Sequence, residues 1–164
     1  MNDDTSPAQA RTRIKICGLT REQDVDAAVA AGVDAIGFVR YPRSARLVSI
    51  DRAVELARRL PPFVTPVLLY VNEAPDQVEQ DLARLACAMP QFHGDETEAY
   101  CQAACGHGAR AYLRAARIPL GVEAASFDLV KYASSYQSAH AILLDALVEG
   151  FGGSGKTFNW SLLP

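Results

Sequence analysis

Residues 13–39 have the sequence RIKICGLTREQDVDAAVAAGVDAIGFV. Two short apolar runs, at 14–17 and 35–39, have the length and composition of buried strands. Between them, Thr20 and Gln23 match a capping box, apolar residues recur on one helical face, and Gly32 stands where a helix C-terminal cap belongs. This stretch therefore predicts a strand, a helix and a second strand.

The same alternation continues along the chain. Further apolar runs at 64–71, 89–92, 111–115 and 141–144 predict four more strands. Ser49 is placed to cap a helix that ends before Pro61, and Pro75 suits the first turn of the next helix. Strands that alternate with helices form a parallel sheet with covered faces, which is either an open doubly wound sheet or a closed barrel.

A polar or reactive residue lies at or near the end of each predicted strand. These residues are Cys17, Arg40, Asn72, His93, Arg114 and Asp145. Open sheets concentrate their chemistry at one switch point, whereas barrels draw functional residues from many strand ends. The distribution favours a barrel. Five of these residues are candidates for a site at its mouth: Cys17, Asn72, His93, Arg114 and Asp145.

Two of these residues suggest acid–base chemistry. Cys17 precedes a predicted helix N-terminus, whose partial positive charge favours a thiolate that can act as a base. Asp145 ends an apolar strand, where partial desolvation favours a protonated carboxyl group that can act as a general acid. The simpler alternatives are a buried structural cysteine and an aspartate that caps a loop. Together, a base and an acid suit an isomerisation of a small substrate.

Three basic side chains are candidates for binding. The loop after the second strand carries Arg43 and Arg46, and either guanidinium could pair with a substrate carboxylate or phosphate. His93 lies at a strand end and is a candidate of lower rank. Solvated surface arginines and a structural hydrogen-bonding histidine are the corresponding alternatives.

Residues 150–157, GFGGSGKT, match the nucleotide-binding pattern GxxxxGK[ST]. A phosphate-binding loop of that kind needs a strand before it, a full helix after it and a later acidic residue for magnesium. Few residues follow Thr157, and none is acidic. A mobile loop that closes over a ligand, with Gly152 and Gly153 as substrate-binding residues, is the favoured interpretation.

Composition excludes several classes of function. The 164 residues carry a formal net charge of −3, and 49% of them are hydrophobic. Without a basic cluster or about 18 consecutive apolar residues, neither a nucleic-acid partner nor a membrane span is expected. The acidic N-terminus is unlike a signal peptide, so we expect a cytoplasmic protein with reduced cysteines and no metal site. Residues 1–12 are expected to be a disordered leader before one domain at 13–164.

Beyond single residues, the chain resembles the phosphoribosylanthranilate isomerases of tryptophan biosynthesis. The resemblance runs in order through KICGLT at 15–20, GFVRYPRSAR at 37–46, QFHGDE at 91–96, LLD at 143–145 and GGSGKTFNW at 152–160. It implies an α/β fold, the (βα)8 TIM barrel, of which this chain contains about the first six βα units.

The family's reaction is an Amadori rearrangement that needs no cofactor. It converts N-(5'-phosphoribosyl)anthranilate to 1-(2-carboxyphenylamino)-1-deoxyribulose 5-phosphate. The resemblance implies that Asp145 is the general acid, that Cys17 is the base, and that Arg46 holds the anthranilate carboxylate. His93 would position the substrate.

The chain departs from the family pattern in two places. Arg40 stands where the family more often has an aromatic or apolar residue, which implies a changed pocket near the anthranilate ring. The family also continues with two further strand–helix units that supply the phosphate site, so we expect a C-terminally truncated barrel.

Two alternatives to the isomerase follow. One is a remnant that is inactive or that complements another fragment and associates through open barrel edges; the other, less favoured, is a nucleotide-binding protein. The sequence leaves the oligomeric state open.

Overall fold

The computed structural model describes residues 11–148, 151 and 155–162. Its strands form one sheet in the order β1-β2-β3-β4-β5-β6, and every neighbouring pair is parallel. The strands are β1 (Lys15–Cys17), β2 (Ala35–Val39), β3 (Thr65–Tyr70), β4 (Met89–Phe92), β5 (Leu113–Ile118) and β6 (Ala141–Ala146). The predicted alternation of six strands with helices is confirmed.

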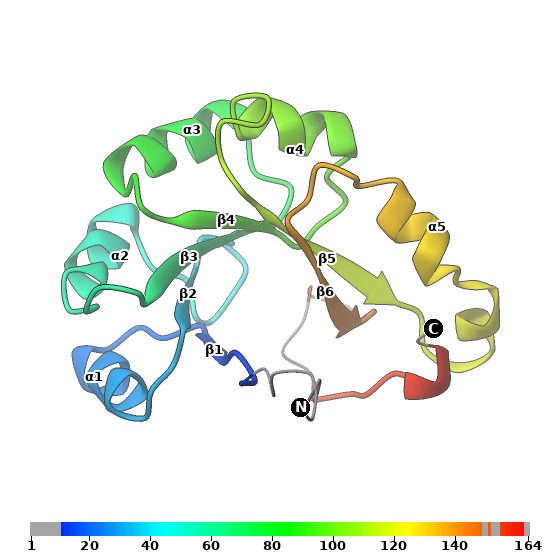
Figure 1. The fold of residues 1–164 in the computed structure, drawn as a ribbon, viewed down its shortest axis with the longest axis horizontal. Helices are drawn as coiled ribbons and strands as arrows, with labels where there is room; N and C mark the ends of the chain where they lie inside the picture. The colour runs from blue at the N-terminus through cyan, green and yellow to red at the C-terminus, as the bar shows by residue number, and fades with distance from the viewer. Residues whose placement is uncertain (1–10, 149–150, 152–154, 163–164) are drawn as a thin grey trace, which may run out of the picture.

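The sheet curves, and its helices lie along the outer side of the curve (Figure 1). They are α1 (Glu22–Ala30), α2 (Ile50–Ala57), α3 (Pro75–Arg84), α4 (Glu98–Ala104) and α5 (Leu129–Ser134), with 3-10 turns η1 (Gly121–Ser126) and η2 (Trp160–Leu162). Parallel neighbours joined through outer helices are the arrangement of a (βα)8 barrel wall. The described residues form the part of that wall built by six βα units.

Two of the three predicted helix starts are confirmed. The Ser49 side chain accepts a hydrogen bond from the Arg52 N–H, and Pro75 occupies the first turn of α3. The predicted capping box at Thr20 is wrong. The Arg21 carbonyl accepts the first helical hydrogen bond, and α1 begins at Glu22, one residue after the start that a Thr20 cap implies. Arg21 makes no side-chain cap.

The predicted bounds of the fifth strand are also wrong. The apolar run suggested 111–115, whereas β5 extends from Leu113 to Ile118. Arg117 interrupts the apolar pattern within this strand, which is why the predicted run stopped early. The shift matters for the site, because it places Arg114 near the start of β5 and Arg117 near its end.

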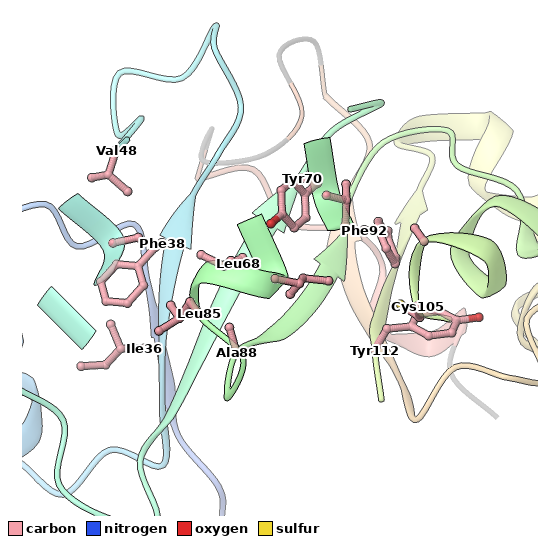
Figure 2. Packing of buried hydrophobic residues seen from close by; sticks show 14 of the residues in the cluster. Ile36, Phe38, Val48, Leu68, Tyr70, Leu85, Ala88, Phe92, Cys105 and Tyr112 are labelled. Atoms are coloured by element: carbon pink, nitrogen blue, oxygen red, sulfur yellow. The ribbon is translucent and has the colours of Figure 1, made fainter. Parts of the chain in front are cut away.

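Side chains alternate between the two faces of the sheet, as they must in a strand. On the outer face, Ile36, Phe38, Leu68, Tyr70 and Phe92 belong to the main hydrophobic core beneath the helices (Figure 2). The residues that directly follow Phe38, Leu68 and Tyr70 point to the inner face. They are Val39, Leu69 and Val71, which form a smaller cluster packed against Cys17. This parity decides which strand-end residues reach the inside of the sheet.

Candidate active site

Cys17 lies on the inner face of β1, beside Gly37 of β2. The two residues are paired in register, and a Cβ atom placed on Gly37 would lie 2.6 Å from Sγ of Cys17 and 3.1 Å from Nζ of Lys15. Gly37 therefore leaves room for both side chains. Cys17 is free and partly exposed, as a thiol that meets a substrate must be.

Asp145 and His93 contact each other across the inner face. Nε2 of His93 lies 2.9 Å from Oδ2 of Asp145, although β4 and β6 are separated by β5. The other ring nitrogen, Nδ1, lies 3.0 Å from the amide nitrogen of Gln91. The sequence pattern proposed two separate strand-end residues here, and the structure joins them into one hydrogen-bonded group.

Burial keeps the imidazole of His93 neutral. It lowers the pKa of His93 below its ordinary value, and the positive charges of Arg117 and Lys15 act in the same direction. The carboxylate of Asp145 opposes this shift through its hydrogen bond and its charge. Since the net direction is downward, His93 carries one ring proton at neutral pH.

Arg46 lies directly over the Cys17–Gly18 peptide. Its guanidinium donates a 3.0 Å hydrogen bond to the Cys17 carbonyl oxygen. Gly18 makes this approach possible, because it has a φ of +87° and a Cβ there would lie 2.6 Å from a guanidinium nitrogen of Arg46. The structure thus places a guanidinium beside the predicted base.

Arg117 and Lys15 are inner-face cations that the strand-end argument missed. Arg117 is the register partner of Asp145, forms an ion pair with Asp95, and lies over the ring of Phe151 with its guanidinium carbon 4.4 Å from the ring centroid. The period of two residues along a strand could have found Lys15, which lies two positions before Cys17.

The inner group therefore combines a thiol, a carboxyl–imidazole pair and three cationic side chains on one surface. Such a set can move protons and hold an anionic substrate. Among the residues that the structure describes, no three His, Cys, Asp or Glu side chains gather as metal ligands would. None of the described helices has the length and apolar character needed to cross a membrane.

Comparison with known proteins identifies the family. Residues 14–164 match the family model of N-(5'-phosphoribosyl)anthranilate (PRA) isomerase. The chain belongs to the PRA isomerase family. It is 61% identical to the N-(5'-phosphoribosyl)anthranilate isomerase of Leptothrix cholodnii, over 94% of this chain and 66% of that protein.

Solved PRA isomerases share the fold. The enzyme from Thermotoga maritima is 35% identical, with a TM-score of 0.77 over 93% of this chain and 70% of that one. A second PRA isomerase structure, 31% identical with a TM-score of 0.70, covers 84% of this chain and 66% of its own. That structure is a complex with reduced 1-(o-carboxyphenylamino)-1-deoxyribulose 5-phosphate. The chain spans about two thirds of the length of the curated relatives it matches, 66% for the Leptothrix protein and 68% for that of Methylibium petroleiphilum.

Not every predicted site residue of this PRA isomerase family member joins the inner group. Arg114 lies on the outer face of β5, where its guanidinium donates to Glu96 at 3.1 Å and to the carbonyl oxygens of Phe92 and Gly94 at 2.9 Å each. It is buried between the sheet and α5, with its guanidinium carbon 4.8 Å from the ring centroid of Tyr136. Its hydrogen bonds hold the β4 end rather than a ligand.

Asn72 joins two loops. Its backbone N–H donates to Oε1 of Glu96 at 2.7 Å, and its side-chain oxygen accepts from the N–H of Asp95 at 2.7 Å. A Cβ atom on Gly94 would lie 2.5 Å from that side-chain oxygen, so the two loops approach closely. Asn72 therefore fixes the β3 end against the β4 end.

Arg40 also points outward, which corrects the expectation that it changes the pocket near an aromatic ring. Its guanidinium forms a buried ion pair with Asp81 of α3, at 2.8 Å, and donates to the Val48 carbonyl oxygen at 2.6 Å. The next inner position after Val39 belongs to Tyr41, which packs with Val39 and Phe151.

The glycine-rich segment is only partly described. Gly152 and Gly153, predicted to bind substrate, lie outside the described residues. After Lys156 and Thr157, the described chain forms only the three-residue turn η2. A nucleotide-binding loop needs a full helix at that point, so this context does not favour the nucleotide-binding alternative.

Proposed function

We propose that this chain catalyses the isomerisation of N-(5'-phosphoribosyl)anthranilate to 1-(2-carboxyphenylamino)-1-deoxyribulose 5-phosphate in tryptophan biosynthesis. Membership of the PRA isomerase family supports this proposal. So does the compound bound to the related PRA isomerase, a reduced form of that product. The observation that carries the proposal is the inner-face group, in which the Asp145–His93 pair shares a surface with Cys17.

In the first step, Asp145 acts as the general acid. Its carboxyl proton passes to the ring oxygen of the ribose as the bond between that oxygen and C1 breaks. The lone pair of the anthranilate nitrogen forms a C=N bond with C1, which gives an open-chain iminium ion. The hydrogen bond from His93 holds the carboxyl group in place for this transfer.

In the second step, Cys17 acts as the base. Its thiolate takes the proton from C2 of the sugar, and the released electron pair forms a C1=C2 bond while the C=N electrons return to nitrogen. The resulting enol becomes the ketone product by moving its hydroxyl proton to C1. The cations Lys15 and Arg46 lie beside Cys17, so positive charge surrounds the proposed base.

Substrate anions require positive partners. Arg46 is proposed to hold the anthranilate carboxylate, because a guanidinium can bind a carboxylate with two parallel hydrogen bonds. His93 contributes by orienting Asp145, and Gly152 and Gly153 stay predicted parts of a loop over the ligand. Arg114 and Asn72 support the site indirectly, through the loops they fix. The cytoplasmic location and the absence of a nucleic-acid partner stay predictions from composition.

The test is the decay of anthranilate fluorescence as the chain consumes phosphoribosylanthranilate. Asp145→Asn and Cys17→Ser should each lower kcat by about 10²–10⁴-fold, the usual contribution of an acid or base. Asp76→Asn and Cys87→Ser are matched controls at exposed positions and should leave kcat unchanged. Full turnover by Asp145→Asn would overturn the assignment of the acid.

The same assay separates the alternatives. An inactive wild-type chain that adopts its fold would favour the remnant over the isomerase. Calorimetric titration with ATP and magnesium tests the nucleotide-binding alternative, which a lack of heat would eliminate.

A further inference from the structure

Gln91 is a buried polar residue for which the reaction scheme has no role. It lies on the inner face of β4, paired in register with Leu69 and Leu113, and it is 1% exposed. Its amide nitrogen lies 3.0 Å from Nδ1 of His93. Its side-chain oxygen has no hydrogen-bond partner in the part of the chain that the structure describes. Burying a glutamine with one amide atom unpaired costs stability, which points to a role for the hydrogen bond that it does make.

The contact with Gln91 determines which nitrogen of His93 carries the proton. An amide nitrogen can only donate, so Nδ1 of His93 must accept and cannot carry a proton itself. A neutral imidazole has one N–H, which is then on Nε2. Nε2 faces Oδ2 of Asp145 at 2.9 Å and donates to it. The three side chains form a directed chain from Gln91 through His93 to Asp145.

Other charged groups around His93 act in the same direction. Burial disfavours a positive charge on the ring, and Arg117 on β5 and Lys15 on β1 add to its effect. Asp145 on β6 is the one group among those acting on His93 that favours a cation. Gln91 on β4 is neutral, and it occupies the nitrogen that would have to be protonated.

We propose that Gln91 is a positioning residue of this site: by donating to Nδ1 of His93, it keeps the imidazole neutral and directs the Nε2 proton at Asp145. The role in catalysis rests on the proposed isomerase function, whereas the protonation state of His93 does not. Gln91 acts through His93 and does not itself transfer the proton.

A neutral His93 matters because Asp145 must hold a proton before it can give one. A neutral ring donates to Oδ2 and leaves the acid proton to Oδ1, which also accepts the N–H of Ala146 at 2.9 Å. An imidazolium at the same place would pair with an ionised Asp145, and that carboxylate would have no proton to transfer to the ribose ring oxygen. Gln91 thereby selects the state of the pair that can act as an acid.

The test compares the wild-type chain with Gln91→Glu. A carboxylate at position 91 can only accept a hydrogen bond, so it would favour a proton on Nδ1. His93 would then lie between two carboxylates and become an imidazolium. Nitrogen-15 NMR of the imidazole distinguishes the two neutral tautomers and the cation. Gln137→Glu makes the same charge change at an exposed position and is the matched control.

At pH 7.5 we expect the wild type and Gln137→Glu to show His93 protonated on Nε2 alone, and Gln91→Glu to show both nitrogens protonated. A wild-type ring protonated on Nδ1 or on both nitrogens would overturn the proposal, as would a Gln91→Glu spectrum identical to the wild type. If Gln91→Glu does not fold, the wild-type spectrum still decides, together with Gln91→Met, which removes the donor and should lose the fixed tautomer.

Kinetics provide the second readout. Gln91→Glu should lower kcat about 10- to 100-fold, less than the roughly 10²–10⁴-fold expected for loss of the acid itself, with KM little changed. An equal loss in Gln137→Glu would contradict a specific role. If the wild-type chain shows no turnover, the proposed function fails, but the NMR result still tests the role of Gln91 on its own.

Discussion

Replacing Glu96 with glutamine tests whether the outer-face ion pair holds the strand ends in place. Glu96 is buried, and its two oxygens accept from the N–H groups of Asn72 at 2.7 Å and Gly94 at 2.8 Å and from the Arg114 guanidinium at 3.1 Å. Glu96→Gln keeps the shape but places an NH2 group where one oxygen was. In either orientation of the amide that group faces a donor, so either the contact to Asn72 or the contacts to Gly94 and Arg114 are lost.

The expected cost follows from the charge left behind. Arg114 is 3% exposed, and without Glu96 its positive charge is buried with only carbonyl oxygens and aromatic rings around it. Removing one partner of a buried pair typically costs about 3–5 kcal/mol. Since a domain of this kind has about 5–15 kcal/mol of stability, the change should remove a large fraction of the total.

Urea unfolding followed by circular dichroism measures this cost. Glu55→Gln is the matched control, because Glu55 pairs with Arg52 at 3.1 Å on the surface and its side chain is 59% exposed. The control should lose no more than about 1 kcal/mol. If both variants lose the same stability, the reasoning about the buried pair is refuted. The double variant Glu96→Gln/Arg114→Met should recover part of the loss, because no unpaired charge remains.

Three further predictions concern other parts of the chain. Gly37→Ala places a Cβ 2.6 Å from Sγ of Cys17, so the thiol must move; we expect an intact circular dichroism spectrum with kcat lowered by up to about 100-fold. Folding lowers the pKa of His93, so below pH about 6.5 the unfolded chain binds a proton that the folded chain does not. The free energy of unfolding should therefore be highest above pH about 6.5 and should fall as the pH drops below that value. His93→Asn should flatten that dependence, and unchanged urea midpoints between pH 7.5 and 5.5 in the wild type would contradict it. Arg40→Met leaves Asp81, 1% exposed, without its cation and should cost about 3–5 kcal/mol in urea unfolding, against a smaller loss in Arg40→Met/Asp81→Leu.

Much of the fold could be predicted from the sequence because strands and helices have different apolar periods. The predicted bounds of β2 and β4 match Ala35–Val39 and Met89–Phe92. The predicted bounds of β5 were wrong because Arg117 interrupts the apolar run before the strand ends at Ile118. Tertiary contacts that neutralise Arg114 lie on other elements, where local sequence carries no sign of them.

The site was predictable only in part, for a reason of parity. Cys17, His93 and Asp145 stand at strand ends and face inward, whereas Arg40 stands at an equivalent place and faces outward. If the first polar residue after an apolar run is shifted by one position, its side chain points to the opposite face of the sheet. Gln91 was missed because a single polar residue within a strand has no distinguishing pattern until its neighbour is known to be His93.

The separation of inward and outward side chains at the strand ends has a practical consequence for protein engineering. The ion pairs Arg40–Asp81 and Arg114–Glu96 brace the loops from outside, and neither shares a hydrogen bond with the inner group. A designer could therefore exchange Cys17 for another reactive side chain while the braces stay intact. The outward side chains of these strands hold the structure together and the inward ones form the proposed site, so either set can be redesigned while the other is left unchanged.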